Sequence, residues 1–163
     1  MTKRRHVFIS HHHADDAKVS GLTTLLGRAG FEIRNSSIRA KPANQRRLDE
    51  KRIPERTLKR LLRMKMSWAS TVVVLVGKDT ASRPWVDWEI STANRLGKRI
   101  VGVYERGGTE NDVPAALERY RDAMVNWNSV KIIDAIEGKD DPSEKPDGKE
   151  SPPNDNMPRS SCA

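Results

Sequence analysis

The apolar run Thr71–Gly77 (TVVVLVG) constrains the fold of this chain more than any other segment. It is rich in β-branched residues and predicts a buried strand. A helix is expected soon after it, because Pro84 suits a first helical turn and Gly97 suits a helix end. The polar connection from this strand to this helix is therefore a candidate ligand-binding segment, since ligands of open α/β sheets bind at such edges.

Strands and helices alternate along most of the chain. Short apolar runs predict further strands at His6–Ser10, Phe31–Arg34 and Arg99–Tyr104. Apolar residues at helical spacing predict helices at Asp15–Arg28, from Pro54 to about Ala69, and at Pro114–Val125. The last apolar run, Val130–Ile133, predicts either a weak fifth strand or a final short helix.

This alternation predicts an α/β fold with a doubly wound, five-stranded parallel sheet. For five strands we expect the flavodoxin-like order 2-1-3-4-5, whose switch point lies between the first and third strands. The loops that leave these two strands are Ser10–Asp15 and Lys78–Arg83. They should face each other across the crevice, so that their polar groups converge.

Length and composition narrow the class of protein. The 163 residues suffice for one domain with one core. No apolar run reaches about 18 residues, so we expect no membrane helix, and the run Val7–Ile9 is too short for a secretory signal. The single cysteine, Cys162, excludes an internal disulfide and fits a reducing, cytoplasmic compartment.

The chain divides into two parts by composition. Residues 137–163 hold five of the nine prolines and seven acidic against four basic side chains, with almost no apolar residue. Such a segment cannot bury enough surface to offset the entropy of ordering. We therefore predict a domain over residues 1–136 and a disordered, charged, proline-rich tail over residues 137–163.

Residues 39–65 are strongly basic, with eleven Lys or Arg against three acidic side chains. This segment fits a phosphate-bearing small molecule, a nucleic acid or an acidic partner, and it equally fits a solvated helix face with a basic loop. No aromatic residue lies among these charges in the sequence, which disfavours binding of single-stranded nucleic acid.

Several kinds of catalytic site lack their motifs. The chain has no GxGxxG, no GxxxxGK[ST] and no GxSxG. The consecutive histidines His11, His12 and His13 point in diverging directions, so we expect no metal site there, although one of them could donate a hydrogen bond to a phosphate or ribose.

The segment RPWVDWEI, residues 83–90, contains the best catalytic candidate, Glu89. Trp85 lies four residues earlier and so on the same helix face. A carboxylate beside an indole in a cleft suits chemistry on a ribose, where it can stabilise an oxocarbenium-like transition state. The alternative is structural: Trp85 and Trp88 anchor the core while Glu89 pairs with a surface arginine such as Arg95.

Three segments resemble the TIR domain family, specifically the TIR-like branch of bacterial antiphage defence represented by the Thoeris ThsB proteins. VFISHHHADD (residues 7–16) is similar to the first TIR box, in which an acid, here Asp15, follows the strand end. GFEIRNSS (residues 30–37) resembles the second strand and the start of the loop after it. SRPWVDWEI (residues 82–90) resembles the box around the catalytic glutamate.

The resemblance implies an enzyme that takes NAD as its substrate and needs no other cofactor or metal. It implies that Glu89 cleaves the bond between nicotinamide and ribose, with Ser10, His11, Asp15, Ser82 and Trp85 lining the pocket. The resemblance implies that the products are nicotinamide and a cyclic nucleotide messenger derived from ADP-ribose. The implied partners are a separate nucleotide-sensing effector, a phage-derived trigger and other copies of the chain, without membrane or nucleic acid.

Two other functions remain open at this point. The first is a TIR interaction module without catalytic activity, which assembles through the basic residues 39–65. The second is a nucleoside-transferring enzyme that uses a similar sheet and carboxylate on another substrate. His11 stands where the family often has an aromatic residue, and the loop from Ser37 to about Ile53 is longer and more basic than the resemblance leads us to expect.

Overall fold

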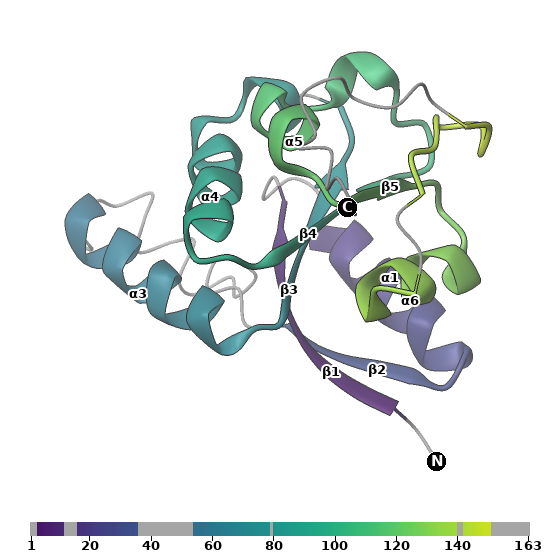
Figure 1. Ribbon diagram of the computed structural model, residues 1–163, viewed down its shortest axis with the longest axis horizontal. Coiled ribbons are helices and arrows are strands. Elements are labelled where there is room, and N and C mark those ends of the chain that lie inside the picture. Colours follow the sequence, from purple (N-terminus) through teal and green to yellow (C-terminus); the bar gives the residue numbers. More distant parts are fainter. Residues whose placement is uncertain (1–2, 12–15, 36–53, 79, 140–141, 151–163) are drawn as a thin grey trace, which may run out of the picture.

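The computed structural model describes residues 3–11, 16–35, 54–78, 80–139 and 142–150. Within them, five strands form one parallel sheet in the order β2-β1-β3-β4-β5, which confirms the predicted architecture (Figure 1). The strands are β1 (Lys3–Ser10), β2 (Phe31–Asn35), β3 (Thr71–Val76), β4 (Arg99–Tyr104) and β5 (Ala123–Val125). The helices are α1 (Asp16–Arg28), α3 (Glu55–Trp68), α4 (Pro84–Arg95), α5 (Ala115–Tyr120) and α6 (Ser129–Glu137), with the 3-10 turns η3 (Thr80–Ser82) and η4 (Glu110–Asp112).

Strand β3 lies at the centre of the sheet and is buried along its whole length. It pairs in parallel with β1, where Val7 lies opposite Thr71, and with β4, where Thr71 lies opposite Arg99. Because all strands are parallel, their carboxyl ends lie along one edge of the sheet. The loops that follow β1 and β3 therefore begin side by side, as the predicted switch point requires.

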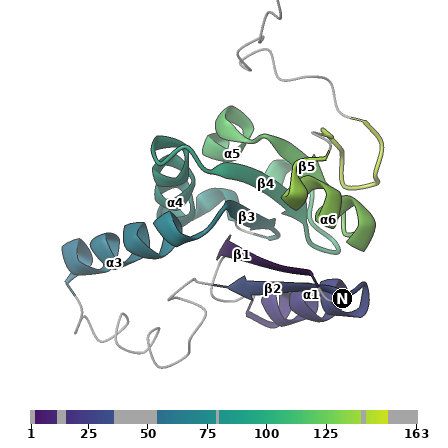
Figure 2. The same ribbon diagram turned by 60° about the horizontal axis from the view of Figure 1, so that its bottom comes forward.

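Helices cover both faces of the sheet (Figures 1 and 2). On one face, α1 and α6 pack against the side chains that include Ile9 and Val73. On the other face, α3, α4 and α5 pack against those that include Phe8 and Val72. Neighbouring residues of a strand thus belong to different cores, because successive side chains point to opposite faces. Each fully buried Leu, Ile or Phe stabilises the fold by about 1.5–3 kcal/mol.

One predicted element near the C-terminal side is wrong. The helix expected over Pro114–Val125 ends at Tyr120, because Arg121 adopts an extended backbone, and its last three residues form strand β5 instead. Of the two alternatives at Val130–Ile133, the short helix is confirmed: these residues belong to α6, whose start is capped by the Asn128 side chain accepting from the Lys131 amide at 3.2 Å.

Residues 142–150 differ from the expected disordered tail. The Met124 amide donates to the Pro142 carbonyl at 2.7 Å, and the Glu144 amide donates to the Met124 carbonyl at 2.8 Å. The Glu144 side chain is buried and forms an ion pair with Lys131. This part of the predicted tail therefore packs against the edge strand β5, while residues 151–163 lie outside the described residues.

Some sequence predictions fall where the structure gives no description. These are Asp15, the loop after the second strand, and the part of the basic segment before Pro54. Among the described residues, no helix is long and apolar enough to cross a membrane.

Two glycine substitutions test the packing of this fold with opposite signs. A Cβ at Gly108 would lie 2.6 Å from the Val76 carbonyl oxygen, a backbone atom that cannot move without disturbing β3. We expect Gly108→Ala to lower the free energy of unfolding by about 1–3 kcal/mol. A Cβ at Gly27 in α1 would meet nothing within 4 Å, so Gly27→Ala should raise it by about 0.5–1 kcal/mol. Urea unfolding checks both; a Gly108→Ala protein as stable as the wild type would contradict the packing of this loop on β3.

Candidate functional site

Buried polar side chains gather where the central strands end. Ser10 ends β1 and is 0% exposed, His11 follows it and is 2% exposed, and Thr80 follows β3 and is 0% exposed. Glu89 comes from α4, which packs on β1, β3 and β4, and it is 1% exposed. Polar groups are seldom buried without a specific role, because each loses its contact with water. The carboxyl edge around β1 and β3 is therefore the candidate site.

Helix α4 follows the carboxyl end of β3 and carries Glu89 on the side that faces the sheet. The helix begins at Pro84, in the first-turn position where proline is favoured. Its buried residues Val86, Glu89, Ile90 and Ala93 recur at helical spacing and so form one face. Glu89 thus lies among apolar side chains of the core, whereas Arg95 is exposed. In the structural alternative Glu89 pairs with a surface arginine such as Arg95; the structure buries Glu89 at 1% exposure and leaves Arg95 exposed.

Asp87, two residues before Glu89, is partly exposed, and partial burial raises the pKa of its carboxyl group. Residues two apart point to different sides of a helix, so this shift concerns the outer side of α4 and not the surroundings of Glu89.

Ser10 and His11 lie on different faces of the sheet. Phe8 belongs to the core beneath α3 and α4, and Ile9 to the core beneath α1 and α6. The alternation of strand side chains continues this pattern, so Ser10 is on the α4 side with Glu89 and His11 is on the α1 side. His11 Nδ1 lies 3.3 Å from the Ile9 carbonyl oxygen, to which the Nδ1–H tautomer donates.

The turn after β3 is held by a pair of hydrogen bonds. The Gly77 amide donates to Thr80 Oγ1 at 2.9 Å, and the Thr80 amide donates to the Gly77 carbonyl at 3.1 Å. Ser82 ends this turn, and its side chain is exposed. The turn therefore sets where Ser82 and the first residue of α4 lie relative to the strand end.

A substitution at Thr80 tests this turn. Thr80→Val keeps the shape of the side chain but removes the acceptor of the buried Gly77 amide. We expect the free energy of unfolding to fall by about 1–3 kcal/mol, because a buried donor is left unsatisfied. Thr80→Ser retains the hydroxyl and serves as the matched control in thermal unfolding. Equal losses in both variants would show that the hydroxyl does not hold the turn.

Trp85 belongs to the first turn of α4, and its side chain packs between α4 and α3. Its ring meets that of Trp88 edge to face, with centroids 5.7 Å apart. The Lys59 Nζ lies 5.9 Å from the Trp85 centroid and 5.7 Å from the Trp88 centroid. Both indoles pack against the core that α3 and α4 share. Of the two roles open from the sequence, these contacts support that of a core anchor, and they hold the helix that carries Glu89.

Glu105 is a second buried carboxylate at this edge that the sequence analysis missed. It follows β4 and is 6% exposed. Its carboxylate occupies the space where a side chain at Gly77 would lie. One signal for it was available: Val76 lies opposite Tyr104 in the β3–β4 register, so the next residues, Gly77 and Glu105, are neighbours as well.

Among the described residues, Glu89 lines neither of two cavities found elsewhere in the fold. One, of about 270 Å³, lies beside β4 and β5. The other, of about 450 Å³, lies between α1 and Trp127. Within the described part of the chain, no three His, Cys, Asp or Glu side chains gather as metal ligands.

Comparisons with known proteins place the chain in a family. The family model of the Thoeris protein ThsB, TIR-like domain, matches residues 8–110, more than half of the chain. Two solved structures are similar: the TIR domains of the activated Roq1 resistosome that recognises the pathogen effector XopQ, and the CMP N-glycosidase BcmB of Clostridium botulinum.

Both structural likenesses are distant. The Roq1 comparison has 19% identity and a TM-score of 0.41, and it covers 61% of this chain and 57% of that one. The BcmB comparison has 15% identity and a TM-score of 0.48, and it covers 83% and 99%. No curated protein matches the chain. The family model, together with the observed sheet order, shows that the chain belongs to the TIR-like domains of the Thoeris ThsB family.

Proposed function

We propose that this protein cleaves NAD between nicotinamide and ribose, with Glu89 as the catalytic carboxylate. The observation that carries the proposal is the burial of Glu89, at 1% exposure, on the sheet-facing side of α4. Glu89 belongs to the first half of α4, the helix that follows the carboxyl end of β3, and parallel sheets bind ligands at that edge. Membership of the Thoeris ThsB family supports this activity and a role in antiphage defence.

In the proposed reaction, the C–N bond between ribose and nicotinamide breaks, and its electron pair leaves with neutral nicotinamide. Positive charge develops on the ribose, and the Glu89 carboxylate stabilises it, as carboxylates do in glycoside hydrolysis. Attack by water then gives ADP-ribose and a proton. Attack by a hydroxyl or ring nitrogen of the same molecule gives a cyclic messenger and a proton.

The other predicted pocket residues have different roles in this proposal, according to where each lies. Ser10 shares the α4 side of the sheet with Glu89 and would contact ribose or phosphate. His11 lies on the opposite side, so it would act from the far wall of the crevice. Ser82 would contribute from the end of η3, and Asp15 from the loop after β1. Trp85 would act through the position of α4.

The proposed biological setting also remains to be tested. The product would act on a separate nucleotide-sensing effector, a phage-derived trigger would switch the enzyme on, and copies of the chain would assemble for activity.

An incubation with NAD, at high protein concentration or with an infected-cell extract, followed by mass spectrometry, tests the reaction class. Nicotinamide together with ADP-ribose indicates hydrolysis. Nicotinamide together with a product that is lighter than ADP-ribose by one water indicates cyclisation. Intact NAD under every condition would reject the proposal.

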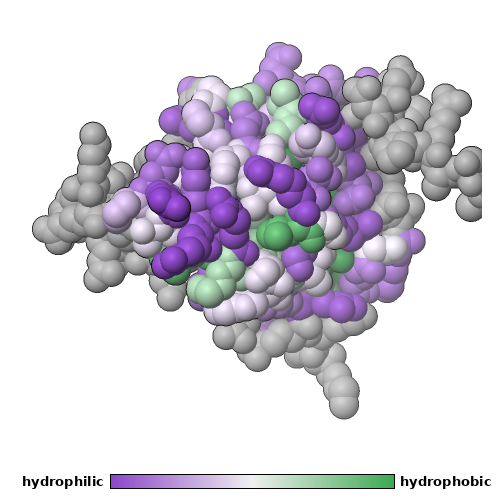
Figure 3. Space-filling view, turned by 60° about the vertical axis from the view of Figure 1, so that its left-hand side comes forward, coloured by the Kyte–Doolittle hydropathy of each residue, from purple (hydrophilic) through white to green (hydrophobic). Residues whose placement is uncertain are grey.

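The second candidate function is a scaffold that assembles through α3. Its exposed side carries basic residues, and hydrophilic side chains gather there in the space-filling view (Figure 3). Trp68 at the end of α3 is 54% exposed, and the Lys65 Nζ lies 4.8 Å from its ring centroid. In the folded chain an aromatic side chain therefore does lie beside these basic residues, although none lies among them in the sequence. Assembly without NAD cleavage, lost on Arg60→Glu with Arg63→Glu, would favour the scaffold over the enzyme.

A further inference from the structure

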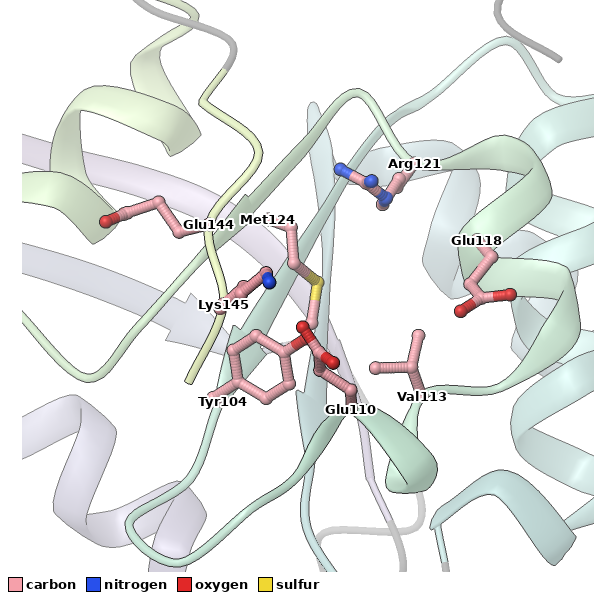
Figure 4. A pocket seen from close by; sticks show the side chains of 8 residues that line it. All are labelled: Tyr104, Glu110, Val113, Glu118, Arg121, Met124, Glu144 and Lys145. Atoms are coloured by element: carbon pink, nitrogen blue, oxygen red, sulfur yellow. The ribbon is translucent and has the colours of Figure 1, made fainter. Parts of the chain in front are cut away.

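A cavity of about 270 Å³ lies beside β4 and β5, and Glu89 is not part of its lining (Figure 4). Tyr104 of β4 and Met124 of β5 contribute from the sheet, and Arg121 comes from the connection between α5 and β5. The rest of the lining comes from η4, the residue after it, α5 and the C-terminal segment: Glu110, Val113, Glu118, Glu144 and Lys145. The volume is just below the range of drug-sized pockets, about 300–1,000 Å³, and suits a smaller molecule.

Arg121 is the feature that most needs a ligand. The residue is partly buried, and its Nη1 atom is buried with no hydrogen-bond partner among the residues that the structure describes. A guanidinium stays protonated in proteins, so its donors require acceptors. Burial of an incompletely satisfied charge destabilises a fold. A carboxylate or phosphate in the cavity would supply what Arg121 lacks.

Lys145 adds a second positive charge to the lining. In Figure 4 its side chain lies near Tyr104 and across the Met124 side chain from Arg121, while Glu144 turns away from the cavity. Glu144 forms its ion pair with Lys131 of that helix, outside the cavity. The C-terminal segment therefore presents a cation to the cavity and directs its own carboxylate elsewhere.

Two carboxylates also line the cavity. In Figure 4 Glu110 lies on the far side of the Met124 side chain from Arg121, whereas Glu118 lies on the same side of Met124 as Arg121. The pKa of the Tyr104 phenol is raised, first by burial and then by the charge of Glu110, while Arg121 opposes the shift. The phenol thus experiences negative charge from one side and positive charge from the other.

These charges select the ligand. A simple anion would meet Glu110 and Glu118, and a simple cation would leave Arg121 unsatisfied. We propose that this cavity binds a small zwitterion of the α-amino acid class, with its carboxylate on Arg121 and its ammonium group toward Glu110, across the Met124 side chain. Val113, Met124 and the ring of Tyr104 provide apolar contact for the rest of the molecule. This site is separate from the proposed NAD site and does not depend on NAD cleavage.

The experiment uses the full chain and three matched probes: L-leucine, 4-methylpentanoate, which lacks the amine, and 3-methylbutylamine, which lacks the carboxylate. Binding is measured by calorimetry and by ligand-detected NMR, with inorganic phosphate as a further anion and the other common L-amino acids as alternatives. We expect L-leucine or another amino acid to bind. Both single-charge analogues of leucine, 4-methylpentanoate and 3-methylbutylamine, should bind at least about tenfold more weakly than leucine.

Variants separate binding from folding. Arg121→Met should abolish binding yet leave the melting temperature without ligand unchanged or higher, because the guanidinium is not fully satisfied in the empty cavity. Glu110→Gln with Glu118→Gln should weaken amino acid binding without weakening that of 4-methylpentanoate. Arg119→Met, at an exposed position of α5, is the control and should bind normally.

Three results would overturn the proposal. The first is no binding of any common amino acid at millimolar concentration to folded wild-type protein. The second is equal binding of leucine and 4-methylpentanoate, or tighter binding of phosphate, which would make the cavity an anion site. The third is normal amino acid binding by Arg121→Met.

Discussion

Glu89→Gln should lower the rate of nicotinamide release from NAD by at least about 10²-fold while the fold stays intact. Glutamine has nearly the same shape as glutamate, so it fits the same place on α4 among Val86, Ile90 and Ala93. It lacks the negative charge that would stabilise the developing ribosyl cation. Because the site is buried, that charge is worth more there than in water. The measurement is the initial rate of nicotinamide formation at saturating NAD.

A matched control separates this effect from a general change in charge. Glu55→Gln removes a carboxylate from the exposed start of α3, where it pairs with Lys59 at 2.9 Å. Exposed pairs of this kind contribute about 0.3–0.5 kcal/mol, so rate and stability should stay close to those of the wild type. Circular dichroism shows whether each variant is folded. A folded Glu89→Gln protein with the wild-type rate would remove Glu89 from the mechanism.

Phe8→Ala should have the largest effect on stability. Phe8 is fully buried in β1, in the core that α3 and α4 cover, two residues before Ser10. Its loss leaves a cavity at the centre of the domain and should lower the free energy of unfolding by about 3–5 kcal/mol. Since domains of this kind are stable by only about 5–15 kcal/mol, much of the total is removed.

Phe8→Leu provides the comparison, since it retains most of the apolar volume and should cost about half as much or less. Denaturant unfolding gives both values. Glu89→Gln and Phe8→Ala should differ in kind. Glu89→Gln lowers the rate of nicotinamide release and leaves the stability unchanged, whereas Phe8→Ala mainly lowers the stability. A Phe8→Ala protein with wild-type stability would mean that α3 and α4 do not pack on β1 as described.

The order of the sheet could be predicted because its central strands are short, apolar and well separated. Thr71–Val76 and Arg99–Tyr104 appear in the structure nearly as their sequences predict. The edge strand could not be predicted in this way. The residues of Ala123–Val125 continue an apolar pattern that also suits a helix, and neither Gly nor Pro marks the break. The extended backbone of Arg121 and the pairing with β4 decide the outcome.

Capping residues mark both ends of the last helix, α6, and a prediction from hydrophobic periodicity alone does not use them. Asn128 is a favourable N-cap, and Gly138, with a φ of 72°, ends the helix in the left-handed region that glycine tolerates. Four apolar-rich residues between them, Val130–Ile133, suit either a strand or a helix. The caps at both ends decide for the helix.

The candidate site was partly predictable for similar reasons. The motif around Glu89 placed it near the start of a helix at the strand edge, and the structure adds that its side chain is buried. The direction of Trp85 depends on Lys59 and Trp88, which come together only through tertiary packing. Glu105 belongs to no motif. Only the register that places it beside Gly77 brings it to the same edge.

The most direct test of the central claim is the stoichiometry of NAD turnover, followed by proton NMR in a single tube. The wild-type chain is incubated with NAD at rising protein concentration, with and without an infected-cell extract, beside Glu89→Gln. We predict that nicotinamide appears one-for-one with the loss of NAD in the wild type and is nearly absent in the variant. Unchanged NAD signals with folded wild-type protein under all these conditions, or equal nicotinamide release by both proteins, would contradict the account.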